Sequence, residues 1–581
     1  PPPNTSSAAS DVYKRQTPFR NPRKPYFQAM RNLRIRLILI LFSCSLLSFD
    51  GGGNYFEISK NIDMFTTMYK ELNSYYVDDI EPNAFMQRGM DAMLEGLDPY
   101  TVFISEADIE DYRFQTTGRY GGIGCYVRQY NDHMVVAEVI QGYGAEEAGI
   151  QGGDRILVVD GINVQGYTTD EVGDIMRGEP NTKVTMRIAR LQSNGEYAEM
   201  EVYPTRQEIQ VLNVPFYGMI NEKVGYIKLS NFMENAAAEV ESAFLELRDG
   251  NAQMESVILD LRGNPGGLLR EAVKICNLFI EKNELVVETK GKLSEWDAEF
   301  KTRENPIDVE IKVAVLINHS SASASEIVSG TLQDLDRGVV IGERSYGKGL
   351  VQTTRPLSYN AQLKLTTAKY YIPSGRCIQA LNYAERRDDG SVGRIPDSLI
   401  QAFTTRNGRT VYDGGGIMPD LEVEMPALSD IAFTLLSEQL IFDYATIFQA
   451  HHASLPLSPS EYYVSDSLFS AFTNWLRIQD FDYTTQSEDA LESLREKSKE
   501  DGYYDAIKET LDALDIELSR DKGADIEKHE DELRQLLNEE IVRRYFFEQG
   551  SIESSFQYDQ QIQRACTVLN DDATYDAYLQ P

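Results

Sequence analysis

The chain has 581 residues, of which 42% are apolar and 25% are charged, a composition typical of a globular protein with roughly three or four domains. Its 91 acidic side chains outnumber its 56 basic ones, and the resulting net charge of −35 repels phosphate backbones, so we expect no nucleic-acid partner. Five cysteines without a CxxC pair and only five histidines exclude a disulfide-dense scaffold and a zinc ribbon and argue against a His-rich metal site, so we expect chemistry without a metal.

The N-terminal region has the composition of a targeting segment rather than of a domain. Residues 1–16 are low in complexity and resemble an artefactual tag or a sequencing scar, and Met30 is a better native start. The sequence MRNLRIR then precedes an apolar run over residues 37–49, which as a helix spans only about 20 Å, short of the roughly 30 Å bilayer core. We predict a signal peptide or an uncleaved anchor over residues 30–50, with lipidation at Cys44 as a weaker alternative. The protein is then exported, periplasmic or associated with the cell envelope, and meets a membrane only through this segment.

The rest of the chain divides into four regions that differ in their residue pattern. Residues 54–117 open with apolar side chains spaced by three or four, which predicts an amphipathic helix and further helical material. Residues 118–205 consist of short β-branched runs broken by glycines. Within residues 206–426, strands alternate with helices between about residues 222 and 372. Residues 427–581 are helical and acidic. A helix predicted over residues 525–545 places Leu533, Leu537 and Ile541 on one face, and its acidic side chains are expected on a solvated outer face. The expected fold class is therefore α/β and multidomain, with a helical N-terminal segment, a β-domain, an α/β core and an acidic helical C-terminal extension.

The β-rich region carries the first functional motif. A glycine cluster, YGGIG, precedes a strand, and the pattern AEEAGIQGGDRILVVDGINV and a predicted helix over residues 168–177 follow it. This order resembles a PDZ domain, although a glycine-rich turn in a plain β-domain is the alternative. In a PDZ domain, closely spaced glycines turn backbone N–H groups inward as a nest for a peptide carboxylate, and a strand edge pairs with the peptide. The predicted peptide-binding residues are Gly121, Gly122, Ile123 and Gly124 in the nest and Val172, Ile175 and Met176 on the helix.

A match to a nucleotide-binding loop is misleading. Residues 342–348, GERSYGK, follow a predicted strand and fit the first seven positions of a phosphate-binding loop. The next position needs Ser or Thr to hold magnesium and is Gly349 here. Because the chain is also strongly acidic and carries an export-like segment, we predict no ATP or GTP binding.

A serine cluster lies where a predicted strand turns into a helix. Ser323 lies at this turn, where helix N-terminal amides favour developing negative charge. Serine is a weak nucleophile and needs a base, for which there are two candidates. His319 lies four residues earlier, with no evident partner carboxylate, and Lys348 lies 25 residues later, one helix and one strand away. A lysine is a base only when burial lowers its pKa, and Gly347 and Gly349 allow the close backbone approach that burial needs.

Four further motifs occur in order after the PDZ-like region: GYIKL from residue 225, DLRGNPGG over 260–267, SASASEI over 321–327 and GKGLVQ over 347–352. Together they resemble the carboxy-terminal processing (tail-specific) proteases, serine peptidases with a Ser/Lys dyad, over roughly residues 55–425. That resemblance implies an α/β serine protease core over residues 206–426 and no cofactor. The implied catalytic residues are Ser323 as nucleophile, Lys348 as general base and Gln352 as a hydrogen-bond partner of the lysine amine. The implied oxyanion hole consists of the backbone N–H of Ala324 and one N–H from Gly266 or Gly267.

Some parts of the chain have no counterpart in these motifs. Ser321 and Ser325 are expected to be turn and helix-cap hydroxyls, and the insertion over residues 380–413 has no predicted role. The helical extension could dock on the core, form an oligomer or bind an adaptor, and the sequence does not choose between these. We expect a serine endopeptidase that captures free C-termini of exported proteins and peptides through its PDZ domain. The alternative is a catalytically silent PDZ scaffold. A trypsin-like PDZ protease has a different order of catalytic residues.

Overall fold

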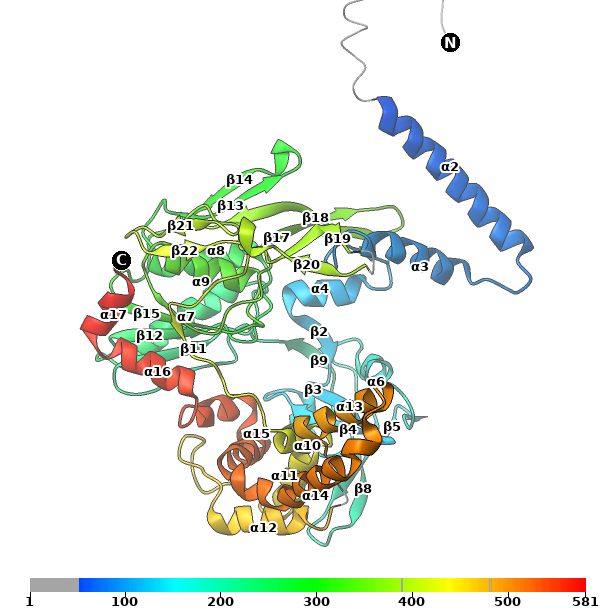
Figure 1. The fold of residues 1–581 in the computed structure, drawn as a ribbon, viewed down its shortest axis with the longest axis vertical. Helices are drawn as coiled ribbons and strands as arrows, with labels where there is room; N and C mark the ends of the chain where they lie inside the picture. Colours follow the sequence, from blue (N-terminus) through cyan, green and yellow to red (C-terminus); the bar gives the residue numbers. More distant parts are fainter. Residues whose placement is uncertain (1–51, 388–389, 480, 482) are drawn as a thin grey trace, which may run out of the picture. The chain divides into compact units, whose positions relative to one another are not determined.

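The computed structural model describes residues 52–387, 390–479, 481 and 483–581 (Figure 1). The predicted tag and the predicted signal or anchor segment lie outside the described residues. The chain forms two compact units that divide between Met90 and Asp91.

The first unit contains the predicted amphipathic helix. It forms α2 (Gly52–Tyr75), and α3 (Pro82–Glu95) starts at a proline, which suits the first position of a helix because its missing N–H has no partner there. Tyr69 of α2 stacks on Phe85 of α3, with ring centroids 6.2 Å apart.

The second unit begins with a segment that was predicted to be helical, and this prediction is only partly right because the segment also contains a strand. After α3 the chain forms the short strand β1 (Val102–Ile104) and then the helix α4 (Ile109–Thr117). Strand β1 pairs antiparallel with a strand more than two hundred residues later, β18 (Gln362–Tyr371). A pairing partner so distant in the sequence leaves no local pattern, so periodicity could not reveal this strand.

The predicted PDZ region folds as a small β-domain. Its sheet has the strand order β3-β4-β5-β7-β8, with β6 on β5, so β3 is an edge strand with one side free to pair. Helix α6 (Thr169–Met176) begins with a capping box between Thr168 and Glu171. The strands are β3 (Cys125–Tyr130), β4 (His133–Val139), β5 (Arg155–Val159), β6 (Ile162–Asn163), β7 (Met186–Leu191) and β8 (Tyr197–Val202). The glycine cluster starts in β2 (Arg119–Gly122), which pairs with β9 (Gln207–Gln210).

The predicted α/β core is a six-stranded sheet between two helical layers (Figure 1). Its strand order is β10-β11-β12-β15-β16-β23, parallel except for β10. Side chains alternate between the two faces of a strand, so in β15 Val313 and Val315 pack against one helical layer and Ala314 and Leu316 against the other. The strands are β10 (Phe216–Met219), β11 (Val224–Lys228), β12 (Ser256–Asp260), β15 (Lys312–Ile317), β16 (Val339–Gly342) and β23 (Leu421–Glu422).

The first helical layer belongs to the core, whereas the second comes from the end of the chain. Helices α7 (Ala236–Gly250), α8 (Leu269–Phe279) and α9 (Ala324–Asp334) cover one face. Helices α16 (Gln560–Leu569) and α17 (Asp572–Tyr578) cover the other face with Ile562, Val568 and Tyr575. The C-terminal extension therefore docks on the core, one of the roles that the sequence left open.

A second sheet lies beside the core. Its strands are β1, β18, β13 (Leu285–Gly291), β14 (Ala298–Lys301) and β17 (Leu350–Pro356), of which β17 pairs with β18. The insertion that had no predicted role forms two hairpins. They are β19 (Leu381–Arg386) with β20 (Val392–Arg394), and β21 (Ala402–Thr404) with β22 (Thr410–Tyr412).

The acidic extension is helical, as predicted, but the amphipathic stretch predicted over residues 525–545 is not one helix. The expected face over residues 525–545 is interrupted at His529, where one helix ends and the next begins, while Leu533, Leu537 and Ile541 are fully buried in the helical core. The helices are α10 (Asp430–Ser437), α11 (Leu440–His451), α12 (Asp466–Leu476), α13 (Gln486–Glu500), α14 (Tyr504–Lys528) and α15 (Glu530–Ser555). In the described residues no single helix is long and apolar enough to cross a membrane. The two helices α10 and α11, joined by a bend, reach that length and apolar composition only when they are taken together.

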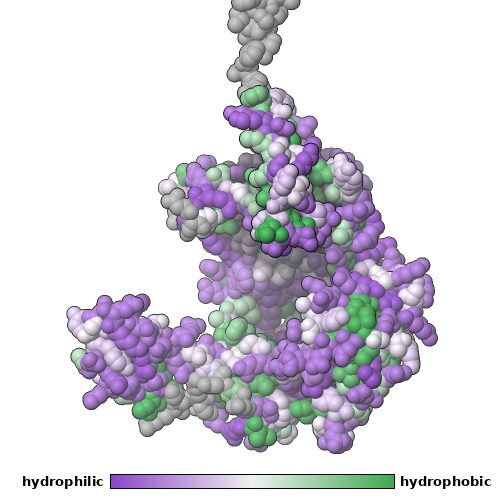
Figure 2. Space-filling view, turned by 90° about the vertical axis from the view of Figure 1, so that its right-hand side faces the viewer, coloured by the Kyte–Doolittle hydropathy of each residue, from purple (hydrophilic) through white to green (hydrophobic). Residues whose placement is uncertain are grey.

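The visible surface is mostly hydrophilic, with small separate apolar patches (Figure 2). This agrees with the excess of acidic side chains in the composition.

Candidate active site

Ser323 has an unusual backbone conformation at the start of α9. Its φ of 55° and ψ of −111° lie where a residue with a side chain is strained, a conformation that costs on the order of 1–3 kcal/mol and persists only where the surroundings enforce it. Two contacts enforce it here. The Ser323 N–H donates to the Glu326 carboxylate at 2.7 Å, and the Tyr370 hydroxyl donates to the Ser323 carbonyl at 3.1 Å.

Lys348 lies in the loop between β16 and β17, the segment that imitates a nucleotide-binding loop. Burial and, next, the neighbouring cation Lys364 lower the pKa of Lys348 to about 8, although the carboxylates of Asp98 and Glu326 act in the opposite direction. About half of this amine is therefore neutral near pH 8, and a neutral amine is the condition for a lysine to act as a base.

One cleft of about 610 Å³ collects the residues that the sequence predicted as catalytic. In the described part of the chain no hydrogen bond joins Ser323 to Lys348, but both side chains open into the same cleft. The predicted site residues in its wall are Ser323, Lys348, Gln352, Gly266 and Gly267.

Gln352 has a different hydrogen-bond partner from the predicted one. Its side-chain amide donates to the Thr366 hydroxyl at 3.1 Å, across the β17–β18 pair. No hydrogen bond from Gln352 to the Lys348 amine is present among the described residues. Gln352, four residues after Lys348, does lie in the wall of the cleft, but the pairing of β17 with β18 orients its side-chain amide towards β18.

The glycine turn after β12 lies directly against the nucleophile. A Cβ on Gly266, which has a φ of 97°, would lie 2.8 Å from the Ser323 Cβ and 2.9 Å from the Ala324 nitrogen, so no other residue fits. The Gly266 N–H donates to the Asn264 side chain at 2.8 Å and is already engaged. Among the described residues, the N–H groups of Gly267 and Ala324 have no acceptor. These two donors are therefore the ones available to an oxyanion.

Two of the other serines hold this turn in place. The Ser321 hydroxyl donates to the Leu261 carbonyl at 2.8 Å, and the Ser325 hydroxyl donates to the Asn264 carbonyl at 3.0 Å. Both hydroxyls thus fasten the serine turn to the chain that follows β12. A buried ion pair between Asp260, the last residue of β12, and Arg262 lies at the start of this segment. Burial opposes ionisation of Asp260, but the Arg262 guanidinium holds the pKa of this carboxyl well below its usual range.

His319 has the carboxylate partner that the sequence did not reveal. Its Nδ1 lies 3.3 Å from an oxygen of Glu343, but its side chain is 80% exposed. It does not line the catalytic cleft. The structure therefore places Lys348, not His319, in the same cleft as Ser323.

Glu326, which was not among the residues predicted from the sequence, connects Ser323 to the loop that carries Lys348. Its buried carboxylate accepts the backbone N–H groups of Ser323 at 2.7 Å, Gly347 at 2.7 Å and Lys348 at 2.9 Å, and the Ser345 hydroxyl at 2.5 Å. It therefore links the backbone of the nucleophile to the backbone of the base. The spacing Ser-x-x-Glu of a helix capping box was the available signal.

We expect Glu326→Gln to lower both activity and stability. Each carboxylate oxygen accepts two donors, so an amide NH₂ in place of either oxygen faces two donors, and each unsatisfied buried donor costs about 1–3 kcal/mol. Peptidase assays and thermal melts should show at least a roughly tenfold loss of kcat/KM and a lower Tm. The exposed Glu222→Gln is the control, and a Glu326→Gln protein with wild-type activity would contradict this link.

The PDZ domain has a groove of about 530 Å³ between β3 and α6, and all four residues of the predicted nest line it. On the helix, Met176 lines the groove, as does Gly173. Val172 does not, because it is fully buried in the domain core, and Ile175 is also absent from the groove wall. Thr169 and Gly173, four residues apart, lie on the side of α6 that borders the groove, whereas Val172 packs into the domain core beside Met176, which contacts both.

The PDZ groove and the cleft that contains Ser323 share two lining residues. Phe114 of α4 and Tyr126 of β3 line both of them. The groove and the cleft therefore adjoin each other at these two side chains.

Comparisons with known proteins agree with this architecture. A model of peptidase family S41 matches residues 223–384, a PDZ domain model matches residues 135–190, and a model of the C-terminal helical domain of a probable PDZ-protease matches residues 431–569. The chain is 34% identical over 344 residues to a carboxy-terminal-processing protease of Bartonella bacilliformis, covering 59% of this chain and 75% of that protein.

Two further similarities are more partial. Over 324 residues the chain is 35% identical to a probable CtpA-like serine protease of Staphylococcus aureus, covering 55% of this chain and 62% of that protein. A solved structure of the photosystem II D1 C-terminal processing protease is 26% identical, with 62% of this chain and 86% of that chain covered and a TM-score of 0.34. By the length and identity of the first relative and by the family models, this chain belongs to the carboxy-terminal-processing proteases, serine-type peptidases of family S41.

Proposed function

We propose that this protein is an endopeptidase that captures the free C-terminus of a protein or peptide in its PDZ groove and cleaves the captured chain with a Ser323/Lys348 dyad. The observation that supports this best is that Phe114 and Tyr126 line both the groove and the cleft. Residues of β2 line the groove, and residues of β17 and α9 line the adjoining cleft.

The chemistry follows from the geometry. The Ser323 Oγ attacks the peptide carbonyl carbon while the neutral Lys348 amine takes its proton. The N–H groups of Ala324 and Gly267 stabilise the oxyanion of the tetrahedral intermediate. When the C–N bond breaks, Lys348 returns the proton to the leaving amine. A water molecule then attacks the acyl-enzyme, with Lys348 again as base, and Ser323 is regenerated.

The remaining features of the proposal concern the setting of this reaction. We propose exported or cell-envelope substrates, because the pattern of residues 30–50 is typical of an export signal or anchor. The catalytic steps use side chains and backbone groups of the chain itself and call for no cofactor. A catalytically silent scaffold is the alternative. It requires binding of C-termini without cleavage, and the lowered pKa of Lys348 inside the serine cleft favours the enzyme over it.

Tail capture is tested by the charge of the peptide terminus. Charge-assisted hydrogen bonds from the nest to a carboxylate contribute roughly 1.5–3 kcal/mol, so an amidated peptide is expected to bind about ten- to a hundredfold more weakly than the free acid. Fluorescence titration of both peptides against the Ser323→Ala protein measures this without cleavage. Equal affinities would show that the domain does not read the terminus.

A groove variant tests the same capture from the protein side. A Cβ on Gly173 meets nothing within 4 Å, so Gly173→Leu fills the groove while a better helix former replaces glycine in α6. We expect it to weaken peptide binding at least about tenfold with an unchanged Tm. Gly250→Leu, at the exposed end of α7 with equally open surroundings, is the matched control. If both variants bind peptide equally well, the groove is not the peptide site.

A further inference from the structure

A tyrosine from the N-terminal part of the second unit covers the proposed base. The ring of Tyr100 lies over the Lys348 amine, with Nζ 3.9 Å from the ring centroid. Tyr100 is not among the motifs that carried the sequence prediction, and it lies in the turn between α3 and β1. An aromatic face at this distance both attracts a protonated amine and occupies the space that water would take.

The turn that carries Tyr100 is firmly held. The buried carboxylate of Asp98 accepts the N–H groups of Tyr100 at 2.9 Å and Thr101 at 2.8 Å. The Thr101 hydroxyl in turn accepts the N–H of Thr366, on the strand that pairs with β1. The ring is therefore fixed to β18 beside the catalytic loop.

The insertion without a predicted role also holds this ring. Tyr383 of β19 packs edge-on against Tyr100, with centroids 6.0 Å apart and an interplanar angle of 82°. At the end of the same strand, Arg386 donates to the Glu95 carbonyl at 2.6 Å, just before the turn. The insertion also begins beside the base, since the Ala380 N–H donates to the Gly347 carbonyl at 2.9 Å.

We propose that Tyr100 is a positioning residue for the general base: its ring, held by the β19 hairpin, covers the Lys348 amine, keeps water away from it and keeps it in place beside Ser323. This inference rests on the proposed Ser/Lys mechanism and adds to it a role for the insertion. Burial raises the pKa of Tyr100, so its phenol stays protonated and does not itself act as a base.

The groups that face the amine determine what the loss of the ring does. They are Lys364 of β18, Asp98 of the turn, Glu326 of α9 and the Tyr100 ring itself. Burial is the largest cause of the lowered lysine pKa, so admitting water raises that pKa. Loss of the aromatic face alone has the opposite effect, because the face favours the protonated amine.

Three substitutions of Tyr100 separate these two effects in the pH dependence of kcat/KM, and a fourth, of Arg386, tests the hairpin. Tyr100→Ala admits water, so we expect the acid limb to move up by about one pH unit, with a roughly tenfold loss near pH 7 that is recovered above pH ~9. Tyr100→Leu keeps an apolar cover without the aromatic face, so its limb should stay or move down. Tyr100→Phe keeps the aromatic ring and should show the same pH profile of kcat/KM as the wild type. Arg386→Ala, which loosens the hairpin, should move the limb in the same direction as Tyr100→Ala but less.

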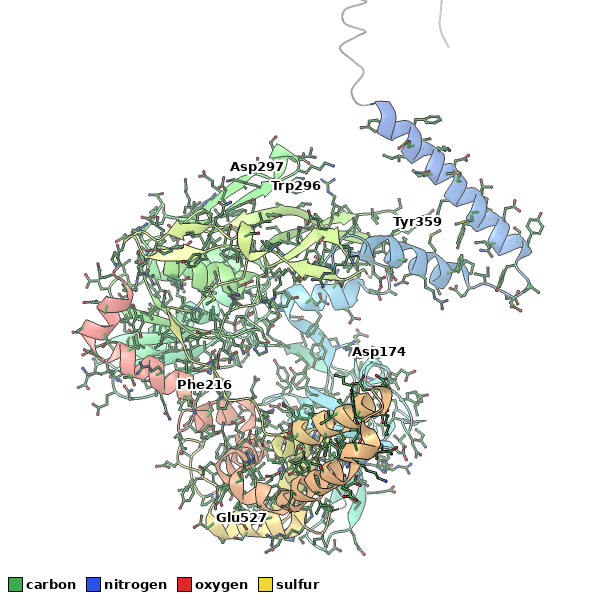
Figure 3. All side chains as sticks on the ribbon, in the orientation of Figure 1. Asp174, Phe216, Trp296, Asp297, Tyr359 and Glu527 are labelled. Atoms are coloured by element: carbon green, nitrogen blue, oxygen red, sulfur yellow. The ribbon has the colours of Figure 1, made fainter. Side chains whose placement is uncertain are left out.

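The control is another tyrosine that touches nothing of the site. Tyr359, 92% exposed at the turn between β17 and β18 and labelled in Figure 3, should be replaceable by Ala with an unchanged profile. A Tyr100→Ala protein with the wild-type profile, or one that loses the same fraction of activity at every pH, would overturn the positioning role. Failure of the dyad itself has a different signature, which is an active Lys348→Ala protein.

Discussion

Ser323→Ala should abolish peptide cleavage, with a loss of kcat of at least about a thousandfold and residual activity at the detection limit. Ser323 is the serine of the cluster that lines the cleft, beside the two N–H donors of Ala324 and Gly267. Its own backbone hydrogen bonds to Glu326 and Tyr370 do not involve the hydroxyl and persist in the variant. Cleavage of a tail peptide followed by mass spectrometry, together with circular dichroism, measures activity and fold separately.

The neighbouring serine is the matched control for this change. Ser321→Ala removes a buried hydrogen bond to the Leu261 carbonyl and therefore lowers stability by about 1–3 kcal/mol, but it leaves the nucleophile in place. We expect a lower Tm with substantial activity, the reverse of the Ser323→Ala result. If Ser323→Ala cleaved peptides at the wild-type rate, the nucleophile would have to be sought elsewhere in the cleft.

Lys348→Arg should be nearly as inactive as Lys348→Ala, although it keeps the positive charge. A guanidinium stays protonated at any pH at which the protein is folded and cannot accept the serine proton. His319→Ala should remain active, because that side chain is exposed and outside the cleft. An inactive His319→Ala protein beside an active Lys348→Ala protein would transfer the role of base to the histidine.

The same assignment predicts the pH dependence of the wild-type enzyme. Lys348 accepts a proton only when it is neutral, so below its pKa of about 8 kcat/KM should fall about tenfold for each pH unit, and above it the rate should level off. Because the cation of Lys364 helps to lower that pKa, Lys364→Gln should move the acid limb to higher pH. A wild-type profile that is flat between pH 6 and 9 would contradict a lysine base.

Much of this protein could be predicted where its signals are local. The glycine cluster and the strand after it predicted a PDZ domain, and alternating strands and helices predicted the α/β core, because both patterns are written in neighbouring residues. The predicted helix over residues 525–545 was wrong in one respect, since the chain breaks at His529. An apolar spacing that continues across a break looks the same in the sequence as an unbroken helix.

The sequence by itself determined the candidate residues of the active site: a serine at a strand-to-helix turn, a lysine between glycines one helix and one strand later, and a glycine turn, in an order that identifies the family. Only the tertiary structure decided how these groups are connected. It oriented Gln352 towards Thr366, engaged the Gly266 N–H within its own turn, and joined the backbones of Ser323 and Lys348 through Glu326. It also packed the ring of Tyr383 edge-on against the ring of Tyr100, 283 positions away. Hydrogen bonds and ring contacts of this kind depend on which distant segments pack together, and packing between distant segments has no periodicity that a single sequence displays.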